Sequence, residues 1–186
     1  MADSNITKKA LAAALKELME TVPFAKISVG DICGKCDMNR KSFYYHFKDK
    51  YDLMNWIYDT EFIAVAKKKS YATEWDFLED ICAYFYANKN FYRKALQIRG
   101  QNSFSDHFRE FLLPVIAEYL KNTVPEKQMQ EFYSNFFADA FICAIVRWIL
   151  EKDCVPSETF LAMLKSCIQS TALRVAGKIS EETVQM

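Results

Sequence analysis

The side chains from Arg40 to Lys50 carry the chemistry that is easiest to assign in this sequence. The run reads Arg-Lys-Ser-Phe-Tyr-Tyr-His-Phe-Lys-Asp-Lys, with cations, hydroxyl groups and an imidazole. Phe43 and Phe47 are four residues apart, so one face of a helix can point both into a core. The other faces then carry the basic, hydroxyl and aromatic groups, which suit the major groove of DNA and its flanking phosphates.

Two short helices are expected to position this run. Ser28 can cap the first helix, and Asp31, three residues on, can complete a capping box. The stretch Asp37-Met38-Asn39 interrupts the helical pattern, and Asn39 is a suitable cap for the second helix. The spacing of the two segments predicts a helix-turn-helix.

Each polar side chain of this region has an expected contact. Arg40 or Lys41 suits a guanine edge, and Ser42 suits a base or a phosphate. Lysines just past the helix suit phosphates, as do N–H groups at helix starts. The alternative for each is a solvated polar group, most plausibly for Lys50 and Thr7, and Tyr45 has the alternative of packing inward. The complete predicted DNA-binding set is Thr7, Ser28, Arg40, Lys41, Ser42, Tyr44, Tyr45, His46, Lys48 and Lys50.

The pair Cys33-x-x-Cys36 lies on the first of these helices and invites a metal or redox interpretation. A structural zinc site needs two more ligands, and His46 is the nearest candidate. The alternative, which we favour, is that both thiols are small apolar groups packed against the second helix. The remaining cysteines lie in apolar helical runs and are expected in the core: Cys82, Cys143, Cys154 and Cys167. We therefore expect no metal and no cofactor.

Two stretches resemble the DNA-binding signature of the TetR/AcrR family of bacterial transcriptional regulators. They are Ile27-Ser28-Val29-x-Asp31-Ile32 and residues 39–53, which include the family's Phe43-Tyr44-x-His46-Phe47-x-x-Lys50 pattern. The resemblance implies that Tyr44 and His46 contact phosphates and that the partner is double-stranded DNA. It also implies a homodimer formed through the last two long helices.

Two further stretches resemble a subgroup of that family, the regulators of dihydroxyacetone-kinase operons. They are Asn88-x-Asn90-Phe91-Tyr92 and Gly100-Gln101-Asn102-Ser103-Phe104. This second resemblance implies that the C-terminal part of the chain can bind a protein partner instead of a small molecule.

The composition predicts an all-α protein. Hydrophobic residues make up 51% of the 186 residues and aromatic residues 15%, and there are only four Gly and four Pro. Such a chain can bury a large core, and alternation typical of strands is scarce. No uninterrupted apolar run of about 18 residues marks a membrane span, and the N-terminus lacks the regions of a signal peptide. We expect a cytoplasmic protein with no membrane partner.

The charges are distributed unevenly although they sum to zero. Residues 1–50 hold nine Lys or Arg and six Asp or Glu, a balance of +3, which leaves −3 for residues 51–186. A basic N-terminal part on an acidic remainder suits a protein that meets phosphate at one end.

The expected organisation is two domains joined by a long helix. A three-helix helix-turn-helix DNA-binding domain is predicted over residues 1–50, and its first helix is expected from Thr7 to Glu20. A helical ligand-sensing and dimerisation domain is predicted over residues 51–186. The connecting helix, capped by Asp49, is expected over residues 49–69, so its tilt would set the position of the N-terminal domain.

Polar groups set among aromatic residues are the candidates for an effector site in the second domain. We list Tyr84, Tyr86, Arg99, Asn102, His107, Phe111, Asn135 and Asp139. The alternative for His107 is a structural role, and the aromatic stripe can equally be core. Arg147 is either an anion partner in a pocket or a salt-bridge partner of Asp139 or Glu151 within the dimer interface, and we favour the salt bridge.

The last two apolar helices have more apolar surface than one small core uses easily. Pairing them with a second subunit gives a symmetric four-helix interface. The predicted interface residues are Phe137, Phe141, Ile145, Trp148, Leu164 and Ile168. A dimer places two DNA-reading helices about 34 Å apart, which matches the two halves of a palindrome.

The sequence therefore predicts a DNA-binding regulator, a ligand-responsive repressor that binds a palindromic operator as a dimer. One alternative is a regulator that senses a protein partner and activates transcription. A second is an all-helical enzyme or small-molecule-binding protein. The second lacks support because the sequence shows no Ser/His/Asp arrangement, no Gly-rich phosphate loop and no Glu-x-x-His pair.

Overall fold

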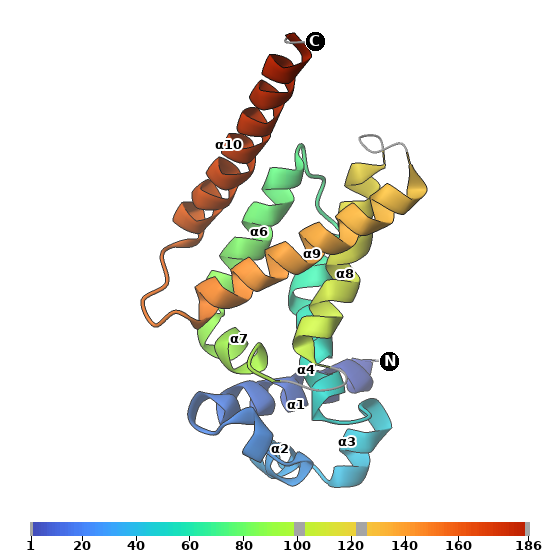
Figure 1. Cartoon of the computed structure of the whole chain (residues 1–186). Helices are drawn as coiled ribbons and strands as arrows, with labels where there is room; N and C mark the ends of the chain where they lie inside the picture. The colour runs from blue at the N-terminus through green and yellow to red at the C-terminus, as the bar shows by residue number, and fades with distance from the viewer. Residues whose placement is uncertain (1, 99–102, 122–125, 185–186) are drawn as a thin grey trace.

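The computed structural model describes residues 2–98, 103–121 and 126–184, and these ranges are helical with no strand. The all-α prediction is confirmed. Three helices form one end of the molecule, which we call the head: α1 (Ala2–Thr21), α2 (Val29–Lys35) and α3 (Arg40–His46). Figure 1 shows the head at the opposite end from the tips of the two last helices. The predicted site residues Arg99 and Asn102 lie outside the described residues.

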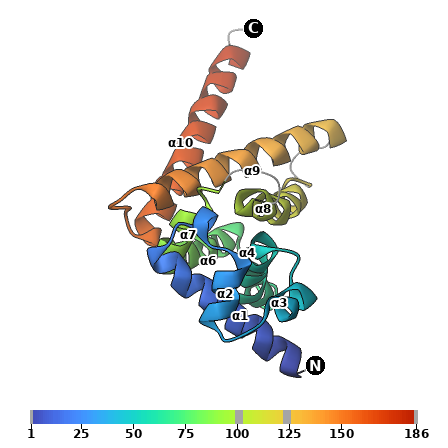
Figure 2. The ribbon, with the colours of Figure 1, turned by 90° about the horizontal axis from the view of Figure 1, so that it is seen from below.

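The rest of the chain, which we call the body, follows a connecting segment. That segment consists of α4 (Lys50–Tyr58), a π-helical turn (Asp59–Ile63) and α5 (Ala64–Ala66). The body contains α6 (Glu74–Ala87), α7 (Lys89–Ala95), α8 (Phe104–Leu120), α9 (Lys127–Leu150) and α10 (Ser157–Val184). Figure 2 shows α9 and α10 diverging from their shared connection, with α9 crossing α8.

Side-chain caps begin several of these helices, and those at Ser28, Asn39 and Asp49 agree with the sequence prediction. Ser28 and Asp31 form a capping box at α2, and Thr73 and Asp76 form another at α6. Asp49 accepts hydrogen bonds from the N–H groups of Tyr51 and Asp52 at the start of α4. These side chains satisfy backbone donors that a helix start leaves unpaired.

We expected one regular connecting helix over residues 49–69. The structure instead has a π-helical turn at Asp59–Ile63. In an uninterrupted α-helix, Glu61 and Val65 would share the face of Tyr58 and Ile57. The wider turn advances the buried face by one residue. Phe62, Ile63 and Ala66 are therefore buried, while Glu61 and Val65 are exposed.

Tyr58 lies at the centre of the aromatic core of the body and is fully buried. Rings from α6, α7 and α8 surround it at centroid distances of 5.2 to 6.4 Å. The packed rings are those of Tyr84, Phe85, Tyr92, Phe104, His107, Phe108 and Phe111. Offset and edge-to-face pairs of this kind stabilise a core beyond their buried area.

Two neighbouring cations of α7 tie the body together and join it to the head. Arg93 donates from Nε to the carbonyl oxygen of Ile149 at 2.6 Å, close to the C-terminus of α9. Lys94 donates to the carbonyl oxygens of Met19 and Glu20, at the C-terminus of α1. Cations at helix C-termini satisfy unpaired carbonyl groups and complement the helix dipole.

The helix α9 is apolar nearly all round, as its sequence predicts. Within the described ranges it is also the one helix long and apolar enough to cross a membrane by length and composition alone. One face of α9 packs in the protomer through Ala138, Ile145 and Ile149. The other carries large apolar side chains that are exposed: Met129, Phe132, Phe136 and Leu150.

Candidate nucleic-acid interface

The helix α3 presents its polar and aromatic side chains outward, as predicted. Phe43 and Phe47 are 0% and 3% exposed and fix the helix to the head. Tyr44 and Tyr45 are 59% and 82% exposed, so the inward alternative for Tyr45 is wrong. The side chains of Arg40, Lys41 and Lys48 are exposed, and those of Ser42 and His46 are half-buried.

The turn between α2 and α3 is held by backbone geometry and one cap. Asp37 has φ of 53°, a left-handed conformation that Asp tolerates better than most residues. The N–H of Met38 donates to the carbonyl oxygen of Cys33 at 2.9 Å. Asn39 Oδ1 then accepts from the N–H of Ser42 at 2.8 Å, which starts α3.

Arg40 does not extend straight away from the head, because its guanidinium lies across Gly30 of α2. A Cβ at position 30 would lie 2.5 Å from a terminal nitrogen of Arg40 and 3.2 Å from its Cζ. Hydrogen bonds from Ser28, helped by the charge of Arg40, lower the pKa of the neighbouring Asp31 carboxyl. Gly30 therefore makes room for a guanidinium that a side chain at this position would displace.

Two predicted phosphate contacts at helix starts lack the geometry on which the prediction rested. α1 begins at Ala2, which places the N–H of Thr7 inside the helix rather than at its end. Ser28 does cap α2, but the capping box uses its donors: its N–H and its hydroxyl both bond Asp31 Oδ2, at 2.8 and 2.7 Å. Neither residue offers the free N–H that the prediction requires.

Lys50 is also not the phosphate contact that we predicted. Its ammonium group donates to the carbonyl oxygens of Phe24 and Ile27 at 2.7 and 2.6 Å, and to that of Ala25 at 3.3 Å. It lies 4.6 Å from the centre of the Phe24 ring. Burial lowers the pKa of Lys50. Because its donors are used inside the head, Lys50 holds the turn before α2 in place.

The two cysteines of α2 have the packing role that we favoured. Cys33 is 2% exposed, and the Cys36 thiol donates to the carbonyl oxygen of Ile32 at 3.3 Å. Burial raises the pKa of both thiols, so both are protonated at neutral pH. Among the other cysteines, Cys82 and Cys154 are buried as predicted, whereas Cys143 and Cys167 are exposed.

The predicted effector residues of the body mostly contact residues outside the predicted set. Tyr84 shares a 2.8 Å hydrogen bond with the buried Tyr92. Tyr86 stacks on Trp148 with a ring separation of 6.0 Å. Asp59 lies in the π-helical turn, and its Oδ1 is 2.7 Å from His107 Nε2. This hydrogen bond raises the pKa of His107.

Asn135 and Asp139 meet at a surface contact rather than in a pocket. Arg109 of α8 donates to both, to Asp139 Oδ1 at 2.7 Å and to Asn135 Oδ1 at 2.6 Å. Arg147, which we expected to pair with Asp139 or Glu151, is exposed on α9. Arg109 takes that role because it faces Asn135 and Asp139 across the α8–α9 contact.

An apolar groove of about 670 Å³ lies elsewhere in the body, and we call it the body groove. It runs between the end of α5, the start of α6, and helices α8, α9 and α10. Of the predicted effector residues in the described ranges, Phe111 alone lines it. Its walls are mainly aromatic and aliphatic, including Trp75, Phe77, Phe111, Val115, Phe137 and Phe141.

Two of the predicted interface residues belong to the core of one protomer. Ile145 is 1% exposed and Trp148 is 3% exposed. The Trp148 ring stacks on Phe160 of α10 at 4.2 Å, and its Nε1 donates to the carbonyl oxygen of Val155 at 2.8 Å. Phe137, Phe141 and Ile168 line the body groove, and Leu164 is half-buried against the core.

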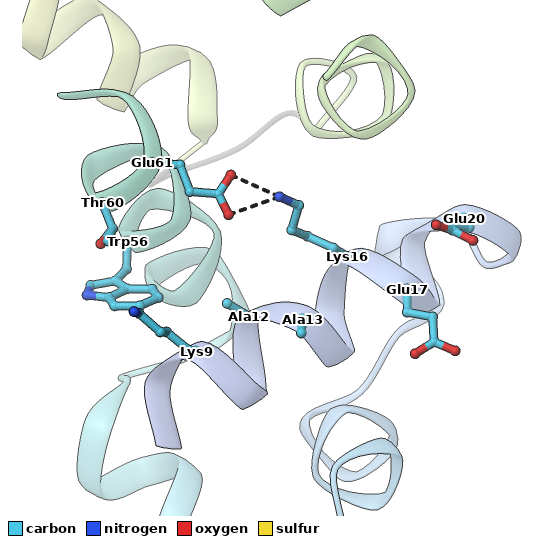
Figure 3. Close-up of a pocket in the computed structure, with 9 residues that line it drawn as sticks. All are labelled: Lys9, Ala12, Ala13, Lys16, Glu17, Glu20, Trp56, Thr60 and Glu61. Atoms are coloured by element: carbon cyan, nitrogen blue, oxygen red, sulfur yellow. Dashed lines mark hydrogen bonds and ion pairs between the residues drawn. The ribbon is translucent and has the colours of Figure 1, made fainter. Parts of the chain in front are cut away.

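A second cleft, of about 470 Å³, lies between α1 and the connecting segment. Figure 3 shows the Lys16 side chain from α1 reaching the Glu61 carboxylate across this cleft, with Trp56 beside Lys9. Lys16 Nζ lies 2.9 Å from both carboxylate oxygens of Glu61. Sequence reasoning missed Lys16, Glu61, Arg93 and Lys94, because no local spacing relates partners that are 45 to 75 residues apart.

Comparisons with known proteins agree with this geometry. The curated relative is the HTH-type dhaKLM operon transcriptional activator DhaS of Lactococcus lactis, which is 27% identical over 145 residues, 77% of this chain and 74% of DhaS. The solved structure of a dihydroxyacetone kinase operon activator DhaS matches with a TM-score of 0.67 and 21% identity, over 89% of this chain and 96% of that one. The resemblance to that subgroup is thereby confirmed.

Two further structures share the fold. A TetR transcriptional regulator from Streptococcus agalactiae has a TM-score of 0.65 and 24% identity, over 87% of this chain and 95% of its own. NalD of Pseudomonas aeruginosa, the secondary repressor of a multidrug efflux pump, has a TM-score of 0.60 and 16% identity, over 87% and 93%.

Matches to family descriptions cover both ends of the molecule. Residues 10–56, which include α2 and α3, match the bacterial regulatory proteins of the tetR family. Residues 73–170 match a transcriptional regulator C-terminal region of that family. This chain therefore belongs to the TetR family of bacterial transcriptional regulators.

Proposed function

We propose that this regulator binds operator DNA through the outer face of α3. The observation that carries the proposal is the exposure of Arg40, Lys41, Tyr44 and Tyr45 on a helix that Phe43 and Phe47 fix to the head. Cations and tyrosine hydroxyls suit base edges and phosphates respectively. Lys48, which is exposed just past α3, supplies a further phosphate contact, and His46 and Ser42 complete the face.

The active form is a homodimer built on the exposed faces of α9 and α10. Met129, Phe132 and Phe136 recur at helical spacing on the open side of α9, and Met163 of α10 is 60% exposed. Contiguous exposed apolar side chains mark protein interfaces. A symmetric pairing of two protomers would cover these side chains and hold two heads at the spacing of a palindromic operator.

The body controls the heads by sensing an effector. The body groove is open, apolar and within the usual size range of ligand sites, about 300 to 1,000 Å³. Ala66 and Lys67, at the end of the connecting segment, line it. An occupant would therefore favour one position of that segment and of the head attached to it. In the cell the protein acts in the cytoplasm, as a regulator rather than an enzyme.

Both directions of control occur among the similar proteins, since DhaS is named an activator and NalD a repressor. A reporter fused to the promoter beside the gene, assayed with and without the regulator, gives the direction directly. A protein effector, the alternative to a small molecule, would co-purify with the dimer under the inducing condition.

The test of DNA binding uses promoter DNA from beside the gene and three proteins: wild type, Arg40→Ala and Tyr44→Ala. We expect tight, salt-sensitive binding by the wild type and at least about a fivefold loss in each variant, because removing one contact costs about 1 to 3 kcal/mol. Unchanged affinity in both variants would remove α3 as the DNA-reading element.

A further inference from the structure

The kind of ligand that the body groove can bind depends on which of its polar side chains are already bonded within the protein. The Tyr71 hydroxyl donates to Asp80 Oδ2 at 2.8 Å, and Lys69 Nζ lies 2.5 Å from the same oxygen. Thr73 is engaged in the capping box of α6 with Asp76. These groups are not available to a ligand without breaking contacts that they make within the protein.

Lys67 differs from them. It lines the groove, its side chain is exposed, and its ammonium group makes no hydrogen bond or ion pair within the described residues. Asp80 is already bonded by Lys69 and Tyr71, and Asp76 is bonded by Thr73. Lys67 is therefore the groove cation without an acidic partner among the described residues, and most of the remaining wall is apolar.

We infer that the body groove binds a small molecule with an apolar body and a single anionic group, of the class of medium-chain or aryl carboxylates. The apolar part lies along Phe111, Val115 and Phe137, and the anion meets Lys67. Burial of the apolar part supplies most of the affinity. The charge supplies selectivity, since Lys67 would attract an anion and repel a cation.

This inference rests on the proposed effector function and names the effector class. Lys67 directly follows α5, so an anion there acts on the C-terminal end of the segment that begins at the head. The same segment carries Glu61, which pairs with Lys16 of α1. A ligand that shifts the end of this segment therefore changes the geometry of a contact between body and head.

The experiment measures binding of decanoate and decanol by titration calorimetry, below the micelle concentration of decanoate. We expect the wild type to bind decanoate at least tenfold more tightly than decanol. Lys67→Gln should reduce the decanoate affinity to that of decanol. The matched control, Lys68→Gln, removes the neighbouring charge, which does not line the groove, and should leave the preference unchanged.

Equal affinities for decanoate and decanol in the wild type would overturn the anionic class. No binding of either would overturn the groove as a small-molecule site, and would point to a partner helix or a second copy of the chain as its occupant. Operator binding is measured on the same preparations. Its retention with no ligand binding would contradict this inference alone, whereas its absence in the wild type would contradict the proposed function.

Discussion

The head and the body use charged side chains in opposite ways. In the head, the cations of α3 are exposed and Lys50 alone among the predicted contacts turns inward to carbonyl oxygens. In the body, most polar groups that resembled a binding site are paired across helices, as His107 is with Asp59. In the head, the side chains that we propose to contact DNA are exposed on a helix that buried rings anchor. In the body, the paired side chains hold the fold together.

The largest expected effect concerns the exposed face of α9. Phe136→Glu places a charge on a side chain that is 58% exposed, so the protomer should fold normally while the dimer fails. Loss of the second head should lower operator affinity by about 100-fold or more. Sedimentation and DNA binding measure the two results. Gln128→Glu, which is exposed on the same helix, is the control, and an intact Phe136→Glu dimer would place the interface elsewhere.

A pair of lysines tests the contrast within the head itself. Lys50→Met removes bonds from an ammonium to three carbonyl groups and should cost about 2 kcal/mol of stability. Lys48→Met should leave stability unchanged and lower the slope of log affinity against log salt by about 1. Urea unfolding and salt titrations of DNA binding measure both. A loss of stability in Lys48→Met together with a lower salt slope in Lys50→Met would reverse the roles of the two lysines.

The pairing of His107 with Asp59 predicts a pH dependence. The hydrogen bond to Asp59 raises the pKa of His107 above its ordinary value near 6.5, with smaller support from Glu110 and Asp52. A raised histidine pKa gives stability that is fully present below pH 6.5 and is lost as pH rises through the folded value. His107→Gln should therefore lower Tm more at pH 6 than at pH 8.5. An equal loss of Tm at both pH values would mean that protonation of His107 does not contribute to folding stability.

The smallest effect is expected at Gly30. Gly30→Ala should displace the Arg40 guanidinium, which is the flexible end of a long side chain, at little cost in stability. Operator affinity should change by about threefold, with the change confined to the base pair or phosphate that Arg40 reaches. Competition binding with single-base operator variants measures it. The same profile for both proteins would show that the position of Arg40 over Gly30 does not affect recognition.

The sequence predicted the head better than the body for a physical reason. Caps, turns and anchors of the head are local, such as Ser28 with Asp31 and Asn39 with Ser42, and each pair lies within three residues. The error at Lys50 arose because its partners are 23 to 26 residues away. Nothing in the local pattern distinguishes a cation that meets phosphate from one that meets carbonyl groups.

The body was predicted as a helical, aromatic domain, but its site was not. Polar residues among aromatic ones suggested a pocket at Tyr84 and His107, where the structure has a packed core around Tyr58. The π-helical turn that moves Phe62 and Ile63 inward has no signal in a pattern read at 3.6 residues per turn. The body groove is formed by two separate stretches of the chain, α5–α6 and α8–α10, and no local pattern relates them.

The central claim, that α3 of the head reads DNA while the body faces an effector, can be tested by one cross-linking measurement. A photoreactive p-benzoylphenylalanine is placed at Tyr45 of α3 or at Tyr119 of α8, which are 82% and 55% exposed. The operator complex is irradiated and the protein–DNA adducts are counted. The account predicts adducts from position 45 and none from position 119. Adducts from position 119 with none from position 45 would contradict it.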